Sequence, residues 1–508
     1  MKFKNPIIKG FHPDPSICRV ENDFYLVTST FEYFPGIPIF HSTDLVNWEQ
    51  IGHCLTTLQQ LPLNETPSSC GIYAPTIRYH DGVFYVVTTN VLEGGNFFVT
   101  ATNPAGPWSE PIWFENSQGI DPSLFFDKDG KCYLTGTGGN HENPGIYQVE
   151  IDIKTGKYLS ERKFIWEGTG GAFPEGPHLY KIGEYYYLMI SEGGTEYGHM
   201  LTISRSMNPY GPFESYERNP IMTHRSMNHP IQATGHADLV QHTDGSWWAV
   251  LLAFRPIGYP KKHHLGRETF LAPVTWTEDK WPIIGDKGTI GVEIESDSIT
   301  STQKSEWKDR DDFDQSVLDL KWIFRRNPLK ENYLINDKEG FLSLIGSSAT
   351  LKDSETHTFV GRRQEHFDCE ISTSLQFKPQ DSEEAGLTIF ANEDFHYEIG
   401  LRSNNGKKEV FFRKNVGSIS VIEKQLAYEQ DTIEFRITAD AEWYRFEIIS
   451  PNGKAITLGI GECGLLSTEV SGGFTGNVFG LYATGNGEKS RNEARFNWFK
   501  YKVTAFQN

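Results

Sequence analysis

Four titratable residues stand at matching points of a repeated sequence pattern and could do acid–base chemistry together. Asp14, Asp121 and Glu175 are carboxylates, and His236 carries an imidazole. Hydrolysis of a glycosidic bond needs two carboxyl groups, one that protonates the leaving oxygen and one that activates water or attacks carbon. Asp14 and Glu175 are the natural pair for these tasks. Asp121 would then be a third carboxylate, whose charge keeps the acid protonated.

The sequence around each of the paired carboxylates bears on its task. Asp14 lies between two prolines in residues 11–16, FHPDPS. Because proline biases the preceding residue toward extended backbone, Asp14 is expected to enter the next apolar run in a stiff, β-like geometry, with a plain Asp-Pro turn as the alternative. Glu175 follows the apolar residues 172–174, which would favour its protonated form, as a general acid requires. The alternative for Glu175 is a salt-bridged surface carboxylate.

Five segments of the first 292 residues share one plan: a short opening, an apolar strand, a turn and an aromatic-rich strand. Asp-Gly, the strongest short hairpin signal, separates the two strands in three of the five segments. Repeats of this size built only of strands are typical of propeller blades, so residues 1–292 are predicted to form a five-bladed β-propeller. A β-sandwich with similar hairpins is the alternative. The five segments open at Asp14, Ala74, Asp121, Glu175 and His236.

The predicted propeller brings these openings together. The innermost strand of each blade begins at the same end of the central channel, so the five opening residues should face one cavity. Packing alone does not favour three carboxylates and a histidine in one place, because desolvating like charges together is costly. The pattern therefore indicates a functional site.

The remainder of the chain has a different organisation. Residues 293–312 are polar and charged and are predicted to be a linker. Residues 313–508 alternate apolar and polar side chains with period two between turns such as Asn405-Gly406. This pattern predicts an antiparallel β-sandwich, and no helix of ten residues or more is expected in either domain.

Composition and charge exclude several classes of protein. A chain of 508 residues is too long for one ordinary core, and its formal net charge of −19 argues against a nucleic-acid partner. The N-terminal residues lack the apolar segment of a signal peptide, and no run of about 18 apolar residues could span a bilayer. We therefore expect a cytoplasmic protein without a membrane partner. The six cysteines include no CxxC pair, which predicts buried thiols rather than a zinc site or disulfides.

A series of short motifs carries a resemblance to a known family. The series resembles glycoside hydrolase family 43, and within it the two-domain β-xylosidases and α-L-arabinofuranosidases. The resemblance covers nearly the whole chain and implies that the second domain is a concanavalin-like sandwich, which packs on the propeller and partly closes the active site. The motifs are FHPDPS at 11–16, GIYAPT at 71–76, GIDPS at 119–123, EGPH at 175–178, GHAD at 235–238 and LGRET at 265–269.

The resemblance also implies a role for each candidate residue. In an inverting mechanism Asp14 would be the general base, Glu175 the general acid and Asp121 the modulator of the acid's pKa. Arg267 is added as a donor to substrate hydroxyls. His236 would lie on the channel axis, where it contacts the substrate site, supports it, or binds a hydrated calcium ion through water. A buried structural histidine is the alternative. No cofactor is required, and a structural calcium ion is left open.

The residues of the sugar subsite follow from the same resemblance. Phe31, Tyr73 and Ala74 would line it, although the family usually has tryptophan at the position of Tyr73, which leaves the preferred sugar open. Near the C-terminus, the glycine-rich residues 472–479 resemble a loop that sends an aromatic side chain toward the propeller pocket.

Two further expectations concern aromatic and histidine side chains. Phe479 is taken as the aromatic that contacts the pocket, with Phe474 as the alternative and a core role open for both. The pair His263 and His264 is expected in a solvated loop, because adjacent residues of a strand cannot both face one metal site.

The expected function is that of an inverting, exo-acting glycosidase that releases β-D-xylose from the non-reducing ends of xylo-oligosaccharides. Removal of α-L-arabinofuranose is the alternative or an added activity. The expected partner is a small oligosaccharide, and a homo-oligomer is suggested by the dimers and tetramers among members of the family. Two other hypotheses stay open: a non-catalytic sugar-binding propeller with a lectin-like sandwich, and a retaining glycosidase of the invertase type, in which the first-blade aspartate attacks carbon.

Overall fold

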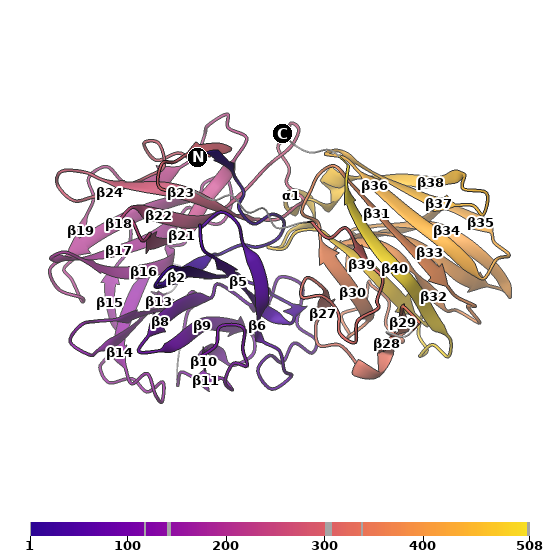
Figure 1. Ribbon diagram of the computed structural model, residues 1–508, viewed down its shortest axis with the longest axis horizontal. Helices are drawn as coiled ribbons and strands as arrows, with labels where there is room; N and C mark the ends of the chain where they lie inside the picture. The colour runs from indigo at the N-terminus through magenta and orange to yellow at the C-terminus, as the bar shows by residue number, and fades with distance from the viewer. Residues whose placement is uncertain (1, 116–117, 140–143, 300–306, 337–338, 505–508) are drawn as a thin grey trace.

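The chain forms two β-domains that lie side by side in the computed structural model (Figure 1). The structure describes residues 2–115, 118–139, 144–299, 307–336 and 339–504. Within these ranges the single α-helix is α1 (Thr468–Ser471), beside the short 3-10 helices η1 (Lys330–Asn332) and η2 (Cys463–Leu466). The expected absence of long helices is confirmed for these residues, and none of their helices is long and apolar enough to cross a membrane.

Five antiparallel sheets make up the first domain, which confirms the predicted five-bladed β-propeller. The first blade contains β2 (Ser16–Val20), β3 (Asp23–Val27), β5 (Gly36–Ser42) and β6 (Glu49–Leu55), and the second contains β7 (Gly71–Ile72), β8 (Thr76–His80), β9 (Val83–Val91), β10 (Gly95–Ala101) and β11 (Ile112–Trp113). The third contains β12 (Ser123–Phe126), β13 (Cys132–Gly139), β14 (Pro144–Ile151) and β15 (Lys163–Trp166). The fourth contains β16 (Glu175–Ile182), β17 (Tyr185–Glu192), β18 (Met200–Ser206), β19 (Glu214–Ser215) and β20 (Met222–Thr223), and the fifth contains β21 (Gln232–Gln241), β22 (Trp247–Phe254), β23 (Glu268–Trp276) and β24 (Pro282–Ile284).

The propeller core lies between the blades rather than inside one layer. Each pair of neighbouring blades shares its own cluster of buried apolar side chains, including the pair formed by the first and the fifth blade. The central strands of the blades are therefore covered on both faces, which explains near-continuous apolar runs such as β22, WWAVLLAF. Burial between blades closes the ring and fixes the five inner strands around one axis.

A buried polar network under the site sets the register of the inner strands. It takes one residue from each blade, and each lies a few positions after the opening of its blade. Ser16 and Arg78 donate to the carboxylate of Asp238 at 2.6 and 2.7 Å, Arg78 contacts His178 at 3.0 Å, and His178 contacts Ser123 at 3.2 Å. Because buried polar groups need partners, this network holds the five openings at one level of the channel.

The second domain is a β-sandwich of two eight-stranded sheets around one large apolar core, as predicted. One sheet contains β28 (Tyr333–Asn336), β29 (Phe341–Ile345), β40 (Glu493–Val503), β31 (Cys369–Gln376), β36 (Thr432–Ala439), β37 (Trp443–Ile449), β38 (Ala455–Glu462) and β26 (Arg310–Asp311). The other contains β35 (Ile419–Ala427), β34 (Lys407–Val416), β33 (Phe395–Asn404), β32 (Glu384–Asn392), β39 (Val478–Thr484), β30 (Thr358–Arg363), β27 (Ile323–Arg325) and β4 (Tyr33–Phe34).

One strand of this second sheet comes from the propeller. The strand β4 belongs to the first blade's connection and pairs with β27 of the sandwich. Next to this pair, the backbone N–H of Arg326 donates to the carbonyl oxygen of Glu32 at 2.8 Å. The two domains therefore share a continuous sheet two residues from Phe31, a predicted sugar contact.

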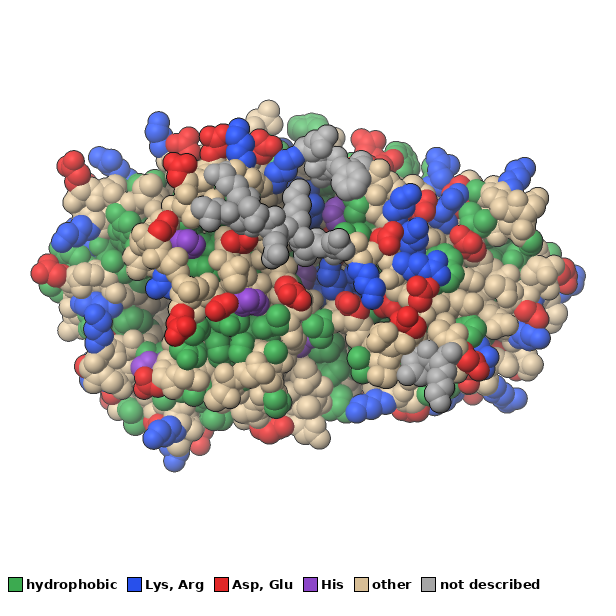
Figure 2. Space-filling view, viewed as in Figure 1, with side chains coloured by type: hydrophobic (Ala, Val, Ile, Leu, Met, Phe, Trp, Pro, Cys, Tyr) green, Lys and Arg blue, Asp and Glu red, His purple; other side chains and the backbone are tan. Residues whose placement is uncertain are grey.

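The predicted linker, residues 293–312, contains two short strands. Its first residues form β25 (Glu293–Glu295), which pairs with β1 (Lys2–Lys4), and β26 near its end pairs with β40. Residues 300–306 of the predicted linker lie outside the described residues. All six cysteines are free, and five of them are buried, as the composition indicated. On the face seen in Figure 2, acidic and basic side chains are interspersed over both domains.

Candidate active site

The opening residues of the blades stand where the repeats place them, but the local backbone differs from the expectation. Asp14 and Asp121 each lie two residues before an inner strand and each have a φ of +55°, and His236 has a φ of +43°. The predicted extended geometry of Asp14 is therefore wrong. Left-handed backbone is tolerated by aspartate better than by most residues, and strained conformations concentrate at functional sites.

Asp14 lies among groups that stabilise its charged form. Ser29 Oγ donates to Oδ2 at 2.5 Å, Arg267 Nη1 donates to Oδ1 at 3.0 Å, and His236 Nδ1 lies 3.8 Å from Oδ1. Burial alone would raise the pKa of Asp14, but the guanidinium of Arg267, followed by His236 and the Ser29 hydrogen bond, lowers that pKa below its ordinary value. Asp14 is therefore ionised at neutral pH, as a general base must be.

Asp121 has the opposite electrostatic environment. Its Oδ2 accepts a hydrogen bond from the backbone N–H of Gly176 at 3.0 Å. Burial, with the neighbouring charges of Glu175 and Asp14, raises the pKa of Asp121 to about 7, against the lowering effects of His236 and the Gly176 N–H. Two carboxylates in one buried site therefore have pKa values moved in opposite directions, a pattern typical of acid–base sites.

Glu175 is the first residue of β16, and its side chain is 18% exposed, against 7% for that of Asp14. The next residue, Gly176, has a φ of +57°, and a Cβ there would lie 3.1 Å from the ring of His236. Glycine at this position lets the chain pass close to the channel axis. Glu175 Oε1 also lies 3.4 Å from Nε2 of His199, a residue that no sequence pattern singled out.

Arg267 joins the carboxylates to the rim of the site. Besides Asp14, its Nη1 contacts Thr195 Oγ1 at 3.0 Å and its Nη2 donates to the carbonyl oxygen of Phe474 at 3.2 Å. Its Nε is buried without a partner among the described residues. The sequence reasoning missed Ser29 and Thr195, because each is a single polar residue outside the repeated motifs and only the fold brings it to the site.

Three aromatic rings meet beside Arg267. The rings of Phe31 and Tyr73 lie 5.3 Å apart, and Phe474 stacks on Phe31 at 5.9 Å and meets Tyr73 at 6.0 Å. The guanidinium of Arg267 lies 5.6 Å from both Phe31 and Phe474. Ala74, which directly follows Tyr73, is buried. The predicted subsite residues Phe31, Tyr73 and Ala74 are therefore brought together.

The predicted pocket contact of Phe479 is wrong. Phe479 lies in β39 with no exposed surface, and its ring packs against Tyr501 in the sandwich core at 5.7 Å. Phe474, the alternative, lies on the loop before this strand, and its backbone N–H donates to Ser69 Oγ of the propeller at 2.8 Å. The sandwich therefore contributes Phe474 to the aromatic cluster.

His236 is held in the site by its neighbours. The backbone N–H of His236 donates to Ser191 Oγ at 2.6 Å, and its ring lies between Asp14 and Gly176. Within the described residues, no group of three or more His, Cys, Asp or Glu side chains is arranged to hold a metal ion. A calcium ion bound to His236 through water stays a prediction from the sequence, and the reaction proposed for the site uses no metal.

The expectation of a solvated loop for His263 and His264 is wrong. Both are buried, because the segment runs between the domains. His263 stacks on Phe254 at 3.8 Å and its Nδ1 contacts Glu469 at 2.7 Å, while burial is the main cause that lowers the pKa of His264 to about 3. The carbonyl oxygen of His264 accepts from Asn477. These contacts of His263 and His264 hold the sandwich against the propeller.

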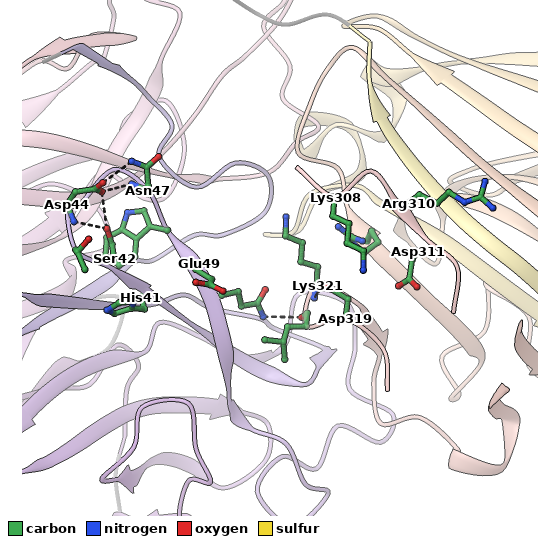
Figure 3. Close-up of a pocket in the computed structure, with 15 residues that line it drawn as sticks. His41, Ser42, Asp44, Asn47, Glu49, Lys308, Arg310, Asp311, Asp319 and Lys321 are labelled. Carbon is green, nitrogen blue, oxygen red and sulfur yellow. Dashed lines mark hydrogen bonds between the residues drawn. The ribbon is translucent and has the colours of Figure 1, made fainter. Parts of the chain in front are cut away.

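A separate cavity of about 850 Å³ lies between the domains (Figure 3), and its lining residues do not include Asp14, Asp121 or Glu175. Its walls carry acidic and basic side chains, among them Glu49, Asp319 and Lys321. Several polar groups in these walls already have hydrogen-bond partners in the protein. Gln50, for example, donates to the carbonyl oxygen of Leu320 at 3.0 Å. This cavity is therefore a polar cleft between the domains rather than the acid–base site.

We expect substitution of Asp121 by Asn to stabilise the protein at alkaline pH. Asp121 binds its proton more tightly in the folded than in the unfolded state, so its contribution to stability is complete below about pH 4 and is lost as the pH rises through about 7. Since Asn cannot ionise, the melting temperature of D121N should equal that of the wild type at pH 4 and exceed it by roughly 5 °C at pH 8.

Thermal unfolding followed by circular dichroism between pH 4 and 8 measures this difference. The exposed Asp129 of the same blade supplies the control, because D129N should follow the wild type at every pH. A D121N curve parallel to that of the wild type would contradict the raised pKa of Asp121.

Two family models together match most of the chain. Residues 3–282 match the glycosyl hydrolases family 43 model, and residues 310–502 match the β-xylosidase C-terminal concanavalin A-like domain. The second match agrees with the predicted type of sandwich.

Known relatives match over nearly their whole length. The chain is 45% identical to the non-reducing end alpha-L-arabinofuranosidase BoGH43B of Bacteroides ovatus, over 98% of this chain and 94% of that protein. It is 40% identical to a xylosidase/arabinosidase of Butyrivibrio fibrisolvens, over 97% and 98% of the two chains. Among solved structures, a xylan beta-1,4-xylosidase from Bacillus halodurans superposes with a TM-score of 0.93 at 33% identity, over 98% of this chain and all of that one.

Proposed function

Because the chain belongs to glycoside hydrolase family 43, we propose that it is an inverting, exo-acting glycosidase that releases β-D-xylose from the non-reducing ends of xylo-oligosaccharides. One observation carries this proposal: Asp14, which is ionised, lies close to Asp121 and Glu175, beside an aromatic cluster to which both domains contribute. Paired carboxyl groups are the machinery that glycosidic hydrolysis requires.

The proposed reaction uses one water molecule and two proton transfers. Asp14 takes a proton from the water as the water oxygen bonds to the anomeric carbon. In the same step the bond from that carbon to the leaving oxygen breaks, and Glu175 donates its proton to the departing oxygen. Asp14 is then protonated and Glu175 ionised, and exchange with solvent restores both.

The residues around Asp14 and Glu175 support their proposed roles as base and acid. Arg267 holds the Asp14 carboxylate and keeps further N–H groups for substrate hydroxyls. Asp121 lies close enough to Glu175 for the two charges to interact, as the proposed modulator of the acid must. A sugar ring can stack on the cluster of Phe31, Tyr73 and Phe474, as aromatic faces commonly allow.

The Phe474 loop supports action at chain ends. Phe474 comes from the sandwich, crosses to Ser69 and covers Phe31, so that the cluster is closed on one side by the second domain. A pocket closed in this way accepts a terminal sugar and excludes the middle of a polymer. The coarser conclusion, a glycosidase that acts on oligosaccharides, follows from family membership itself.

A second candidate activity is the release of α-L-arabinofuranose. The relative at 45% identity carries that activity in its name, and the one at 40% is named for both sugars. Tyr73 in place of the tryptophan usual in the family also alters the sugar subsite of this chain. The two sugars can present similar hydroxyls to one pocket, so a single site can hydrolyse both.

Initial rates on 4-nitrophenyl β-D-xylopyranoside and 4-nitrophenyl α-L-arabinofuranoside test the two candidates. We expect turnover of at least one, and their ratio of kcat/KM assigns the main activity. Negligible hydrolysis of both substrates by a folded enzyme would overturn the proposed function. Proton NMR of the first-formed sugar distinguishes inversion from retention, and a product with the substrate's anomeric configuration would exclude the inverting mechanism.

Replacement of Phe474 by Ala should weaken substrate binding more than it slows the chemical step. Loss of one stacking ring removes about 1 kcal/mol of binding free energy, which corresponds to a rise in KM of roughly 5-fold. Steady-state kinetics on the better 4-nitrophenyl substrate measure this change. Phe164, an exposed ring on β15 in the third blade, supplies the control F164A, which should leave KM unchanged. An unchanged KM in F474A would contradict the subsite.

Other expectations follow from the proposed reaction or stay predictions. Hydrolysis needs water alone, so no cofactor is proposed for the chemical step. A structural calcium ion, a homo-oligomer and a cytoplasmic location stay predictions from the sequence.

A further inference from the structure

A buried histidine outside the predicted site lies against the proposed acid. His199 directly precedes β18 and has no exposed surface. Its Nε2 lies 3.4 Å from Oε1 of Glu175. No repeat or motif marks this residue in the sequence, and the reaction as described above gives it no task.

The other ring nitrogen fixes where the proton of His199 sits. Nδ1 lies 3.2 Å from the backbone carbonyl oxygen of Ala233. A carbonyl oxygen can only accept a hydrogen bond, so Nδ1 is the donor and Nε2 of the neutral ring carries a lone pair. This lone pair is buried and has no hydrogen-bond partner among the described residues. It faces the carboxyl group of Glu175.

The ring of His199 cannot swing away from this position. Gly235 packs directly on it, since a Cβ at residue 235 would lie 2.2 Å from Cε1 and 2.3 Å from Nδ1. The backbone N–H of His199 donates to the carbonyl oxygen of Glu196 at 2.9 Å, and its own carbonyl oxygen accepts from Thr223 at 3.0 Å. The lone pair is therefore held in place before any substrate arrives, as preorganised groups in enzymes are.

Other charged groups around Glu175 come from four elements. Asp14 and Asp121 precede inner strands of other blades, and His236 lies on β21. Glu192 ends β17 and accepts hydrogen bonds from the loop at 169–171 and from Thr202 on β18. Among the described residues, His199 alone places an acceptor nitrogen against Glu175 Oε1.

We propose that His199 is a positioning residue for the general acid. In the resting enzyme the protonated carboxyl group of Glu175 directs its O–H at His199 Nε2, which fixes the orientation of that carboxyl group and keeps the proton on it. When a substrate binds, the O–H turns to the leaving oxygen and the proton is transferred there. This inference rests on the proposed role of Glu175 as the acid.

Two substitutions separate positioning from packing. In H199N the amide nitrogen can replace Nδ1 and keep the bond to Ala233, but nothing faces Glu175. In H199Q the amide group reaches the place of Nε2. A glycoside with a 2,4-dinitrophenolate leaving group needs little protonation, whereas xylobiose depends on the acid.

We expect kcat of H199N to fall about 10- to 100-fold on xylobiose and less than about 3-fold on 2,4-dinitrophenyl β-D-xylopyranoside, with part of the loss restored in H199Q. Should arabinofuranosides be the better substrates, the corresponding pair of activated and unactivated arabinofuranosides replaces them. His224 supplies the control, because its Nδ1 likewise contacts a carbonyl oxygen, that of Ile231, while its Nε2 accepts from the backbone of Ile290. H224N should change both rates by the same factor.

Equal losses on the two substrates in a folded H199N, or no loss on either, would overturn the proposal. Should H199N not fold, nitrogen-15 NMR of histidine-labelled wild-type enzyme carries the test: the proposal requires an Nδ1–H ring for His199 whose Nε2 resonance moves in E175A, and an Nε2–H ring overturns it. A wild-type enzyme that hydrolyses none of these glycosides would instead contradict the proposed function. Failure of the His199 proposal and failure of the proposed function therefore give different results.

Discussion

Replacement of Asp14 by Asn should lower kcat by about 10²- to 10⁴-fold on every substrate, whatever its leaving group. Asn keeps the size of the side chain and can still meet Ser29 and Arg267, but its amide cannot take a proton from water. An activated leaving group does not help, because attack by water still needs a base. Rates on xylobiose and on 2,4-dinitrophenyl β-D-xylopyranoside, or on their arabinofuranoside equivalents, measure the loss.

The pH profile gives the same assignment an independent check. Because Arg267 and its neighbours hold the pKa of Asp14 below the ordinary value, activity of the wild type should persist until the pH falls below about 4. The control D23N, on β3 of the same blade, should keep wild-type rates. Near-wild-type turnover in D14N would show that Asp14 is not the base.

Replacement of Glu175 by Ala should have an effect that depends on the leaving group. On xylobiose, whose leaving sugar needs a proton, kcat should fall by about 10²- to 10⁴-fold. On the 2,4-dinitrophenyl glycoside, whose leaving group departs as a stable anion, the loss should stay below about 10-fold. The contrast between the two substrates, measured by steady-state kinetics, identifies the acid.

The exposed Glu184 in the same blade supplies the matched control, since E184A should leave both rates unchanged. Equal losses in E175A on both substrates would assign Glu175 a task other than proton donation. Unchanged behaviour in E175A would favour the non-catalytic sugar-binding propeller over an enzyme.

The fold was predictable because the chain repeats. Five openings with similar strands after them determine a ring, and alternation with turns determines the sandwich, so both domains could be predicted without any knowledge of long-range contacts. The backbone of Asp14 was not predictable from the proline rule, because the contacts with Ser29 and Arg267 are formed only in the folded site. Tertiary interactions there override a local preference.

The site was predictable where residues belong to the repeat and unpredictable where they do not. Ser29 and His199 contact the carboxylates and Thr195 contacts Arg267, each from beside the end of a second or third strand, at a position that carries no sequence signal. The choice between Phe474 and Phe479 depended on the exact end of a strand in the sandwich, and strand ends are the least certain part of a prediction from sequence.

The pairing of β4 with β27 has a consequence for how products leave. Opening the two domains like a hinge would break this shared sheet and the hydrogen bonds from the buried Arg325 to Ser68 Oγ and from the buried Arg326 to the carbonyl oxygen of Thr66. Since hydrogen bonds between buried groups are costly to break, such an opening would be rare on the time scale of turnover. The released sugar must therefore escape past the Phe474 loop, and local motion of that loop, rather than movement of whole domains, would limit the rate of product release.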